Sequence, residues 1–446
     1  MSRINALVIE RFLACCIASA VVFHIWHVFE FGYLFVPFFY EPSDTFMDWF
    51  NTVFWAHDPG RYDNWQTIYP PLSFSIMRLL SIKSCYADSE GLTARDCDWV
   101  GTVVLLSVFF LNSLLIFLVF WRIDRTTVVP RWFALSFGLP MLHALERGNI
   151  LLMAFTGVLL AFGPLLASAR LRWLALAVAI NLKVYLLAIL FPQLLKRRWR
   201  WFEGALLATI LVYIVSFLHI GDGSPGQIIG NILAATDVFE AGSFLDGWYA
   251  VTYQPFMAIL QSNYIPIISI IGSDAVEALL LIIPTILRFT QGIIAVAAIC
   301  VWLRPEAVPT SMVTLLGLLM ALVTSETSGY TEMFLVLFVF NQRWQGIGRP
   351  CAILMCYILC IPADIIIDRL TPGVAESYLA GGRVTFEFVL TLGPFIRPLL
   401  VQIAACAISA TVINMVRRDF AQGNGDARSR FGTEYLGPRR TTPSQA

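Results

Sequence analysis

The chain has 446 residues, a formal net charge of zero, and only 13% charged residues against 58% hydrophobic ones. A soluble globular domain carries about 25% charged residues, so this chain lacks the polar side chains that a water-exposed globule needs. The zero net charge also gives no electrostatic basis for binding nucleic acid.

Apolar stretches long enough to cross a bilayer as a helix recur along the chain. They are continuously apolar rather than alternating, which favours helices over a membrane barrel. The sequence therefore predicts one all-α polytopic membrane domain over 1–416, with roughly 10–13 transmembrane or re-entrant helices. Full spans are predicted near 7–29, 100–121, 132–146, 149–168, 201–220, 276–303, 309–325, 330–342, 350–367 and 386–416.

The first apolar run, residues 6–28, is longer than the apolar core of a signal peptide and has no clear cleavage site. We therefore expect a retained first helix.

Short loops rich in Lys and Arg set the expected orientation, because such loops stay in the cytoplasm. If all of them lie inside, both termini are cytoplasmic. The polar tail 417–446 is expected to be cytoplasmic and disordered. The basic positions are Arg3 and Arg11, Arg122, Arg125 and Arg131, Arg170 and Arg172, the run 196–200, Arg343 and Arg349, and the tail.

Residues 172–195 lie between two basic loops, so both of their ends are expected on the cytoplasmic side. The stretch is interrupted at Asn181-Leu182-Lys183, and each half of ~10 residues is too short to cross a ~30 Å core. We predict a re-entrant or broken hairpin with Lys183 near its tip, inside protein or beside a cavity. The alternative is one ordinary span in which the Lys183 side chain snorkels to the surface.

Two long segments are left for the external side, 30–99 and 221–275. Within the first, the apolar stretch 72–82 could be a short span or an interfacial helix. Cys85 and Cys97 flank a polar loop there, so a disulfide is expected if the loop faces an oxidising compartment. The other seven of the nine cysteines lie in apolar runs and are interpreted as small core residues.

Asp44 and Asp48 lie four residues apart in the first external segment and would share one face of a helix. Nearby Phe and Trp residues supply the apolar side of a helix that lies on the membrane. A carboxylate partly desolvated at the lipid–water boundary gains basicity, which suits a general base. The alternative is that these acids only solvate an interfacial loop.

Glu146-Arg147-Gly148-Asn149 forms a tight turn between two predicted spans, on the expected external side. Gly148 permits such a turn. Arg147 opposes the positive-inside bias there, which makes it a candidate ligand for an anionic group such as phosphate. The alternative is a snorkelling arginine paired with Glu146.

Lys183 is a further candidate, because an ionisable residue within a membrane run often has a function. The polar turn 325–332 is interpreted as a connecting loop, and Arg288 and Arg397 could meet a lipid head group or an internal acid. We find no phosphate-binding glycine motif, His-rich metal signature or Ser/His/Asp arrangement.

Five pieces follow one another along the chain: Asp48, Gly60-Arg61-Tyr62, Tyr69-Pro70-Pro71-Leu72, Gly148-Asn149, and Asn181-Leu182-Lys183-Val184-Tyr185 before the basic run. In this order they resemble glycosyltransferase family 87, membrane enzymes of the GT-C class that use polyprenyl-phosphate sugars. The resemblance covers roughly residues 1–220, and only Gly329-Tyr330 is similar in the second half.

The resemblance implies a GT-C bundle in a bacterial inner membrane, with its active site on the outer face. One sugar, a mannose-like hexose or a pentose, would pass from a polyprenyl-phosphate donor to a lipid- or glycan-linked acceptor. Asp48 is the first candidate for the base and Asp44 the second. No cofactor is implied, although the two aspartates could hold a divalent ion. The residues expected to bind the donor or its phosphate are Arg61, Tyr69, Arg147, Asn149 and Lys183.

Two other functions fit the many spans. A transporter or flippase for a lipid-linked glycan would need paired broken helices and deep charges, and only one broken helix is predicted. An enzyme that polymerises or ligates lipid-linked glycans would need large external loops, and the segment 221–275 is long enough for one.

Overall fold

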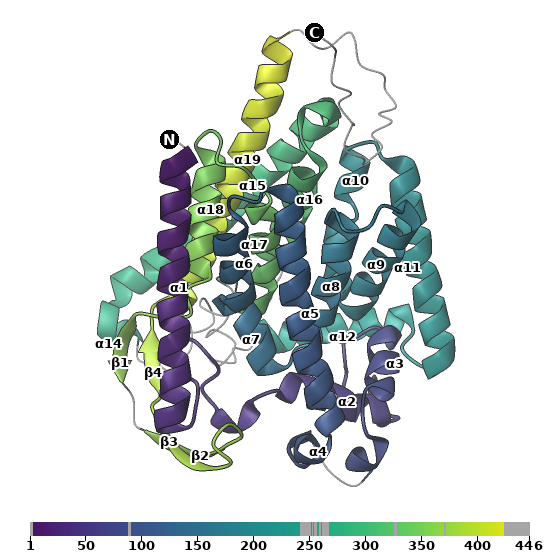
Figure 1. Cartoon of the computed structure of the whole chain (residues 1–446), viewed down its shortest axis with the longest axis vertical. Helices are drawn as coiled ribbons and strands as arrows, with labels where there is room; N and C mark the ends of the chain where they lie inside the picture. The colour runs from purple at the N-terminus through teal and green to yellow at the C-terminus, as the bar shows by residue number, and fades with distance from the viewer. Residues whose placement is uncertain are drawn as a thin grey trace.

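The computed structural model describes residues 3–87, 91–240, 267–324, 328–369 and 372–422, together with residues 251, 253, 257 and 260. This part of the chain is mostly helical (Figure 1), as the sequence predicts. Six helical stretches in it are long and apolar enough to cross a membrane, which makes the chain a polytopic membrane protein. They are α1 (Arg3–Phe31), α5 (Trp99–Ile123), α6 (Val128–Phe137) with α7 (Leu139–Arg147), α11 (Trp199–Ile220), α15 (Ser273–Leu303) and α19 (Gly393–Ala421).

The long helices differ in how much of their apolar surface the protein covers. Only 17% of the most apolar part of α1 and of α15 is buried, against 67% for the stretch formed by α6 and α7. A helix that stays apolar while exposed has lipid as its expected surroundings. We therefore place α1, α11 and α15 at the rim of the bundle and α6 with α7 inside it.

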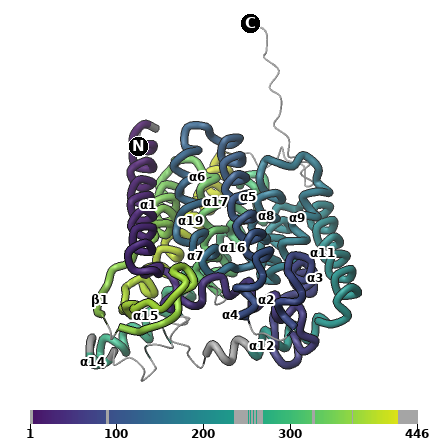
Figure 2. The backbone as a smooth tube through the Cα atoms, turned by 60° about the horizontal axis from the view of Figure 1, so that its bottom comes forward, coloured from purple at the N-terminus to yellow at the C-terminus, as the bar shows by residue number. Residues whose placement is uncertain are grey.

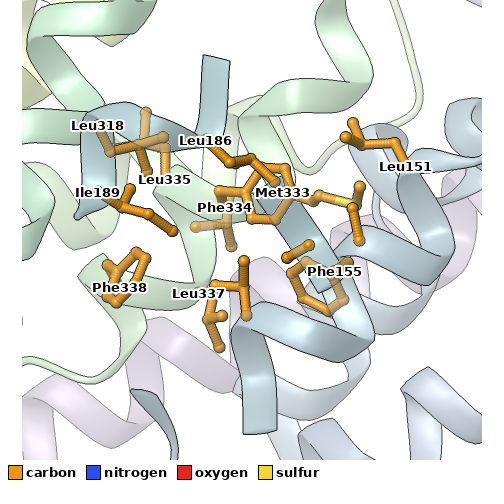
Figure 3. Close-up of a cluster of buried hydrophobic side chains, with 14 of the residues drawn as sticks. Leu151, Phe155, Leu186, Ile189, Leu318, Met333, Phe334, Leu335, Leu337 and Phe338 are labelled. Atoms are coloured by element: carbon orange, nitrogen blue, oxygen red, sulfur yellow. The ribbon is translucent and has the colours of Figure 1, made fainter. Parts of the chain in front are cut away.

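Shorter helices fill the centre, where the sequence predicts full spans. Every residue of α17 is buried. Its side chains pack against Leu151 and Phe155 of α8 and Leu186 and Ile189 of the chain after α9, as Figure 3 shows. The predicted span 149–168 is too long, because α8 ends at Phe162 before Gly163-Pro164. The short helices are α8 (Leu151–Phe162), α16 (Thr310–Thr324), η6 (Gly329–Thr331), α17 (Glu332–Phe340) and α18 (Gly348–Leu359).

The break predicted at Lys183 is confirmed. Helix α9 (Ala169–Leu182) ends there because Lys183 has an extended backbone, with φ −144°. The chain then returns through η3 (Val184–Ile189) and α10 (Pro192–Leu195) to the end of the bundle where α9 began (Figure 1). Both basic loops of this hairpin therefore lie at one end, with Lys183 away from them.

The basic loops are joined to one another at that end, which we call the cationic end. Arg122 donates to the Pro164 carbonyl at 2.9 Å, and Arg197 donates to the Trp302 carbonyl at 3.2 Å. The start of α1 and the end of α19 lie at the same end (Figure 1). The grouping of these loops on one side is thus as the sequence predicts.

The opposite end, which we call the acidic end, is built mainly from the first long segment. The predicted disulfide between Cys85 and Cys97 is present, with 5.7 Å between the Cα atoms. Helix α3 has nine residues and is about 14 Å long at ~1.5 Å per residue, so the stretch 72–82 does not span. The elements are η1 (Pro42–Asp44), α2 (Met47–His57), α3 (Pro71–Leu79), η2 (Lys83–Tyr86) and α4 (Gly91–Cys97).

A small β region corrects the all-α prediction and the spans 350–367 and 386–416. Helix α18 ends at Leu359, shortly before Pro362, and α19 begins only at Gly393. Between them β1 (Ile366–Arg369) pairs antiparallel with β4 (Val389–Thr391). β2 (Gly373–Ser377) pairs with β3 (Gly382–Phe386) in a hairpin, with Ser377 opposite Gly382. Proline stops the helix, and β-branched residues such as Ile366, Val374 and Val389 favour the strands.

The second predicted external segment, 221–275, is described only in part. Helix α12 (Pro225–Glu240) follows α11 at the acidic end, and α14 (Ile267–Ile271) precedes α15 (Figure 1). Most of residues 241–266 lie outside the described part of the chain, as does the predicted tail beyond Gln422.

Candidate functional site

Asp44 and Asp48 are brought together by a bend in the chain and do not share one helix as the sequence predicts. Asp44 ends η1 and Asp48 lies in the first turn of α2. Phe46 between them has a left-handed backbone, with φ 68°, a conformation uncommon for a non-glycine residue. Its N–H donates to the Glu146 carbonyl at 2.7 Å. The bend turns both carboxylates toward the end of α7.

Arg147 binds both carboxylates, although its sequence separation from them is about a hundred residues. Its guanidinium donates to Oδ2 of Asp44 and, at 2.9 Å, to Oδ1 of Asp48. It also lies over the Phe39 ring, 4.1 Å from the centroid. Arg147 thus pairs with Asp44 and Asp48, and not with Glu146 as in the alternative interpretation. The side chains are 13% to 26% exposed, so the group can be reached from outside.

Gly148 makes this approach possible. It ends α7 with φ +68°, and a Cβ atom there would lie 2.7 Å from the Phe46 carbonyl oxygen. Only glycine combines that backbone conformation with such close contact at low cost. The turn predicted at Gly148 is therefore confirmed, and its role is to let the two segments touch.

Asn149 completes the group. Its Nδ2 donates to Oδ2 of Asp48 at 2.7 Å, and its Oδ1 accepts from the N–H of Leu151 at 3.0 Å. It also lies 3.0 Å from the hydroxyl of Tyr330 in η6. The interpretation of 325–332 as a plain connecting loop misses the role of Tyr330. The one sequence feature that pointed to Tyr330 is Gly329-Tyr330 before an apolar run. Residues 325–327 lie outside the described part.

The two aspartates differ in what they can do. Asp48 accepts a hydrogen bond on each of its oxygens. Oδ1 of Asp44 accepts none from the residues that the structure describes. Burial raises the pKa of the Asp44 carboxyl above its ordinary value, although the Arg147 charge opposes this. Asp44 is therefore the better placed of the two to accept a proton, and Asp48 is held as a partner of Arg147 and Asn149.

A second polar group forms at the tip of the broken hairpin. Lys183 Nζ lies 3.3 Å from the Tyr69 hydroxyl and 4.3 Å from the centroid of its ring. Tyr69 is held in turn, because its carbonyl accepts from the Tyr62 hydroxyl at 2.8 Å. Within the described residues Lys183 forms no ion pair with an acid. Its charge is thus available to an anionic ligand.

Tyr185 lies two residues after Lys183 at the tip of the broken hairpin. Its side chain is partly buried, and its hydroxyl has no hydrogen-bond partner among the described residues.

Arg61, the remaining predicted phosphate ligand, has other partners. It is only 3% exposed. Its Nη1 binds Asp222 at 2.9 Å and its Nε donates to the Trp55 carbonyl at 3.2 Å. It joins the first segment to the end of α11, so the structure does not bring it to the Asp44–Asp48 group.

Two hollows lie between helices of the described part, one of them apolar and the other lined in part by an ion pair. One, of about 440 Å³, is lined by Leu72 and Ser75 of α3, Val178 of α9 and Val215 of α11, among others. Helix α3, which lines it, is joined to the tip of the broken hairpin, because the Ser73 hydroxyl donates to the Leu182 carbonyl at 3.3 Å. The other, of about 280 Å³, contains the ion pair of Asp364 and Arg397, 3.1 Å apart. Among the residues that the structure describes, no three His, Cys, Asp or Glu side chains are grouped to hold a metal.

Comparison of the chain with known protein families, with curated proteins and with solved structures finds no match. The class that the fold defines is a polytopic, mostly helical membrane protein. At one end of its bundle a pair of aspartates shares one arginine.

Proposed function

We propose that the protein is a membrane glycosyltransferase that moves one sugar from a polyprenyl-phosphate donor to a lipid- or glycan-linked acceptor. The observation that carries the proposal is the shared arginine, which keeps two carboxylates together and partly exposed at the end of the bundle opposite the basic loops. By the positive-inside rule that end faces outward. We further propose the inner membrane of a bacterium as its location.

The carboxylates supply the base that the transfer needs. The acceptor O–H approaches the anomeric carbon, the Asp44 carboxylate takes its proton, and the new C–O bond forms. The bond from the anomeric carbon to the phosphate oxygen breaks, and the lipid phosphate leaves with the electron pair. One base suffices because phosphate is already a good leaving group, so inversion at the anomeric carbon is expected, whereas a hydrolase needs a second carboxyl as acid.

Lys183 and Tyr69 supply the complementary site for the leaving phosphate. The lysine carries a charge that is not neutralised by an acid in the described structure, and a fixed cation stabilises developing negative charge. The apolar cavity between α3, α9 and α11 is suited to the first isoprene units of the donor. A lipid-linked donor would thus keep its chain in the membrane while its sugar reaches Asp44 and Asp48.

The proposal is tested with purified protein in lipid nanodiscs. Polyprenyl-phosphate mannose and polyprenyl-phosphate arabinose serve as donors, and a lipid fraction from the native membrane serves as acceptor. We expect transfer of one sugar, and loss of at least about a hundredfold in kcat for Asp44→Asn, in line with the usual worth of a positioned base.

Asp368→Asn is the matched control, because Asp368 is an exposed carboxylate at the same end of the molecule. It should leave transfer unchanged. Equal activity of Asp44→Asn and the wild type would remove Asp44 from the mechanism, and Asp48→Asn then tests the residue that the sequence ranks first.

A further inference from the structure

Arg95 holds the backbone on both sides of Asp44. It lies in α4, two residues before Cys97 of the disulfide, and is 7% exposed. Its Nη1 donates to the Ser43 carbonyl at 2.7 Å and to the Thr45 carbonyl at 2.8 Å. Two carbonyls that converge on one nitrogen fix the direction of the chain between them, and the residue between them is Asp44.

Tyr378 closes the other face of Arg95. It follows β2 in the hairpin β2–β3, which lies against the segment leading to α2 (Figure 2). The Arg95 guanidinium carbon is 4.1 Å from the centroid of the Tyr378 ring, and the Phe46 ring meets the same ring edge-on at 5.6 Å. The N–H of Tyr378 donates to the Pro42 carbonyl at 3.4 Å. Residues 42–46 are thus held by a hairpin that comes from near the end of the chain.

A charged side chain at this place has both a cost and a benefit in free energy. Removing a cation from water costs free energy. Asp96, 3.5 Å from Nε of Arg95 and 68% exposed, is its only acidic partner among the described residues. An apolar side chain would leave the Ser43 and Thr45 carbonyls without this donor. A planar guanidinium, however, can stack on a ring and donate to two carbonyls at once.

We propose that Arg95 and Tyr378 are positioning residues that hold the Asp44 carboxylate against Arg147. On the opposite side of the same segment, Phe46 is fixed by its N–H bond to Glu146 and by its contact with Gly148. The segment 42–46 is therefore held from two sides, and the contacts with Arg95 fix the position of Asp44. This inference rests on the proposed function only for its catalytic readout.

The experiment compares Arg95→Ala, Tyr378→Leu and Tyr378→Phe with the wild type. In Arg95→Ala we expect kcat for sugar transfer to fall by about tenfold to a hundredfold, since a displacement of about 1 Å can cost that much. KM for the donor should change less than about twofold, because Lys183 and Tyr69 are untouched. Tyr378→Phe keeps the ring and should have the kcat of the wild type. Tyr378→Leu should have a kcat between those of the wild type and of Arg95→Ala.

A rescue experiment separates positioning from folding. Millimolar guanidinium chloride, far below denaturing concentrations, should restore activity several-fold in Arg95→Ala, because guanidinium can occupy the place between the carbonyls and the ring. It should restore less in the double variant Arg95→Ala/Tyr378→Leu. If kcat in Arg95→Ala falls, guanidinium does not restore it, and the thermal stability falls as well, the proposal is overturned in favour of a purely structural role.

Hydrogen exchange tests the clamp without any donor. The amides of Asp44 and Phe46, both hydrogen-bonded, should exchange at least about tenfold faster in Arg95→Ala, while those of 151–155 in α8 stay unchanged. Unchanged exchange at 44–46 contradicts the clamp even if the protein transfers sugar. If the wild type transfers no sugar but the exchange result is obtained, the clamp stands and the proposed function fails.

Discussion

Each end of the bundle has an arginine that pairs with acidic side chains, and the two arginines differ in how completely they and their partners are buried and hydrogen-bonded. At the cationic end Arg131 binds both oxygens of Glu10 and the carbonyls of Phe340 and Gln342. Tyr357 and Trp344 also donate to Glu10, and Glu10 and Arg131 are 0% and 4% exposed. At the acidic end Arg147 binds two partly exposed carboxylates, and one oxygen of Asp44 accepts no hydrogen bond from the described residues.

This difference distinguishes a structural ion pair from a candidate catalytic group. A closed group such as Glu10 with Arg131 can exchange no proton with a substrate, so it serves to join α1, α6 and α18. An open group with a spare carboxylate oxygen and access from outside can act on a ligand. The same residue types therefore form a structural ion pair at one end of the bundle and a candidate active site at the other.

The largest expected effect is on stability at the cationic end. Glu10→Gln leaves Arg131 buried without its counter-charge, and the free energy of unfolding should fall by about 3–5 kcal/mol. Arg147→Gln leaves two aspartates that water can reach, so its loss should be much smaller. Unfolding by titration with sodium dodecyl sulfate measures both. An equal loss in the two variants would remove the distinction drawn above.

The next largest effect sharpens the contrast between Lys183 and Arg61. A charged contact to the donor phosphate is worth about 1.5–3 kcal/mol, so Lys183→Met should lower kcat/KM for the donor by roughly tenfold to a hundredfold. Arg61→Met should act mainly on stability, because Arg61 already binds Asp222. Donor kinetics that respond to Arg61 and not to Lys183 would reverse the assignment.

A smaller effect is expected in the pH profile. Asp44 acts as a carboxylate, and burial raises its pKa above the ordinary value of 3.8. Activity should therefore fall as the pH drops through that raised pKa, so the acidic limb of kcat/KM lies above pH 3.8. The limb should be lost from the residual activity of Asp44→Asn. A profile that is flat down to pH 4 would show that no raised carboxyl takes part.

The smallest effect is expected at the surface of the β region. Arg369 pairs with Glu387 at 2.8 Å, but its side chain is 64% exposed. Arg369→Ala should change the free energy of unfolding by less than about 0.5 kcal/mol and leave transfer unchanged. This variant is the baseline against which the Arg95 and Arg147 variants are measured.

Features that depend on neighbouring residues could be predicted from the sequence. The long apolar helices, the break at Asn181-Leu182-Lys183, the turn at Gly148 and the disulfide between Cys85 and Cys97 all have local signals. The strands of 366–391 were missed because Ile, Val and Phe suit a membrane helix as well as a strand.

Features that depend on distant contacts could not be predicted. The sequence indicates Asp44, Asp48, Arg147 and Asn149 as separate candidates, but only the fold brings them into hydrogen-bonding contact. Arg61 and Asp222 are 161 positions apart, so nothing local showed that Arg61 is already paired. Tyr330 and Arg95 gave weak signals or none, since each acts on a segment far away in the chain.

The most direct measurement follows both halves of a donor labelled in its sugar and in its phosphate, with the protein reconstituted in sealed vesicles. The account predicts that labelled sugar appears on a new product while polyprenyl phosphate is released in equal amount, and that both depend on Asp44 or Asp48. Donor that crosses the bilayer with its sugar still attached, and no new product, would contradict it and indicate a transporter.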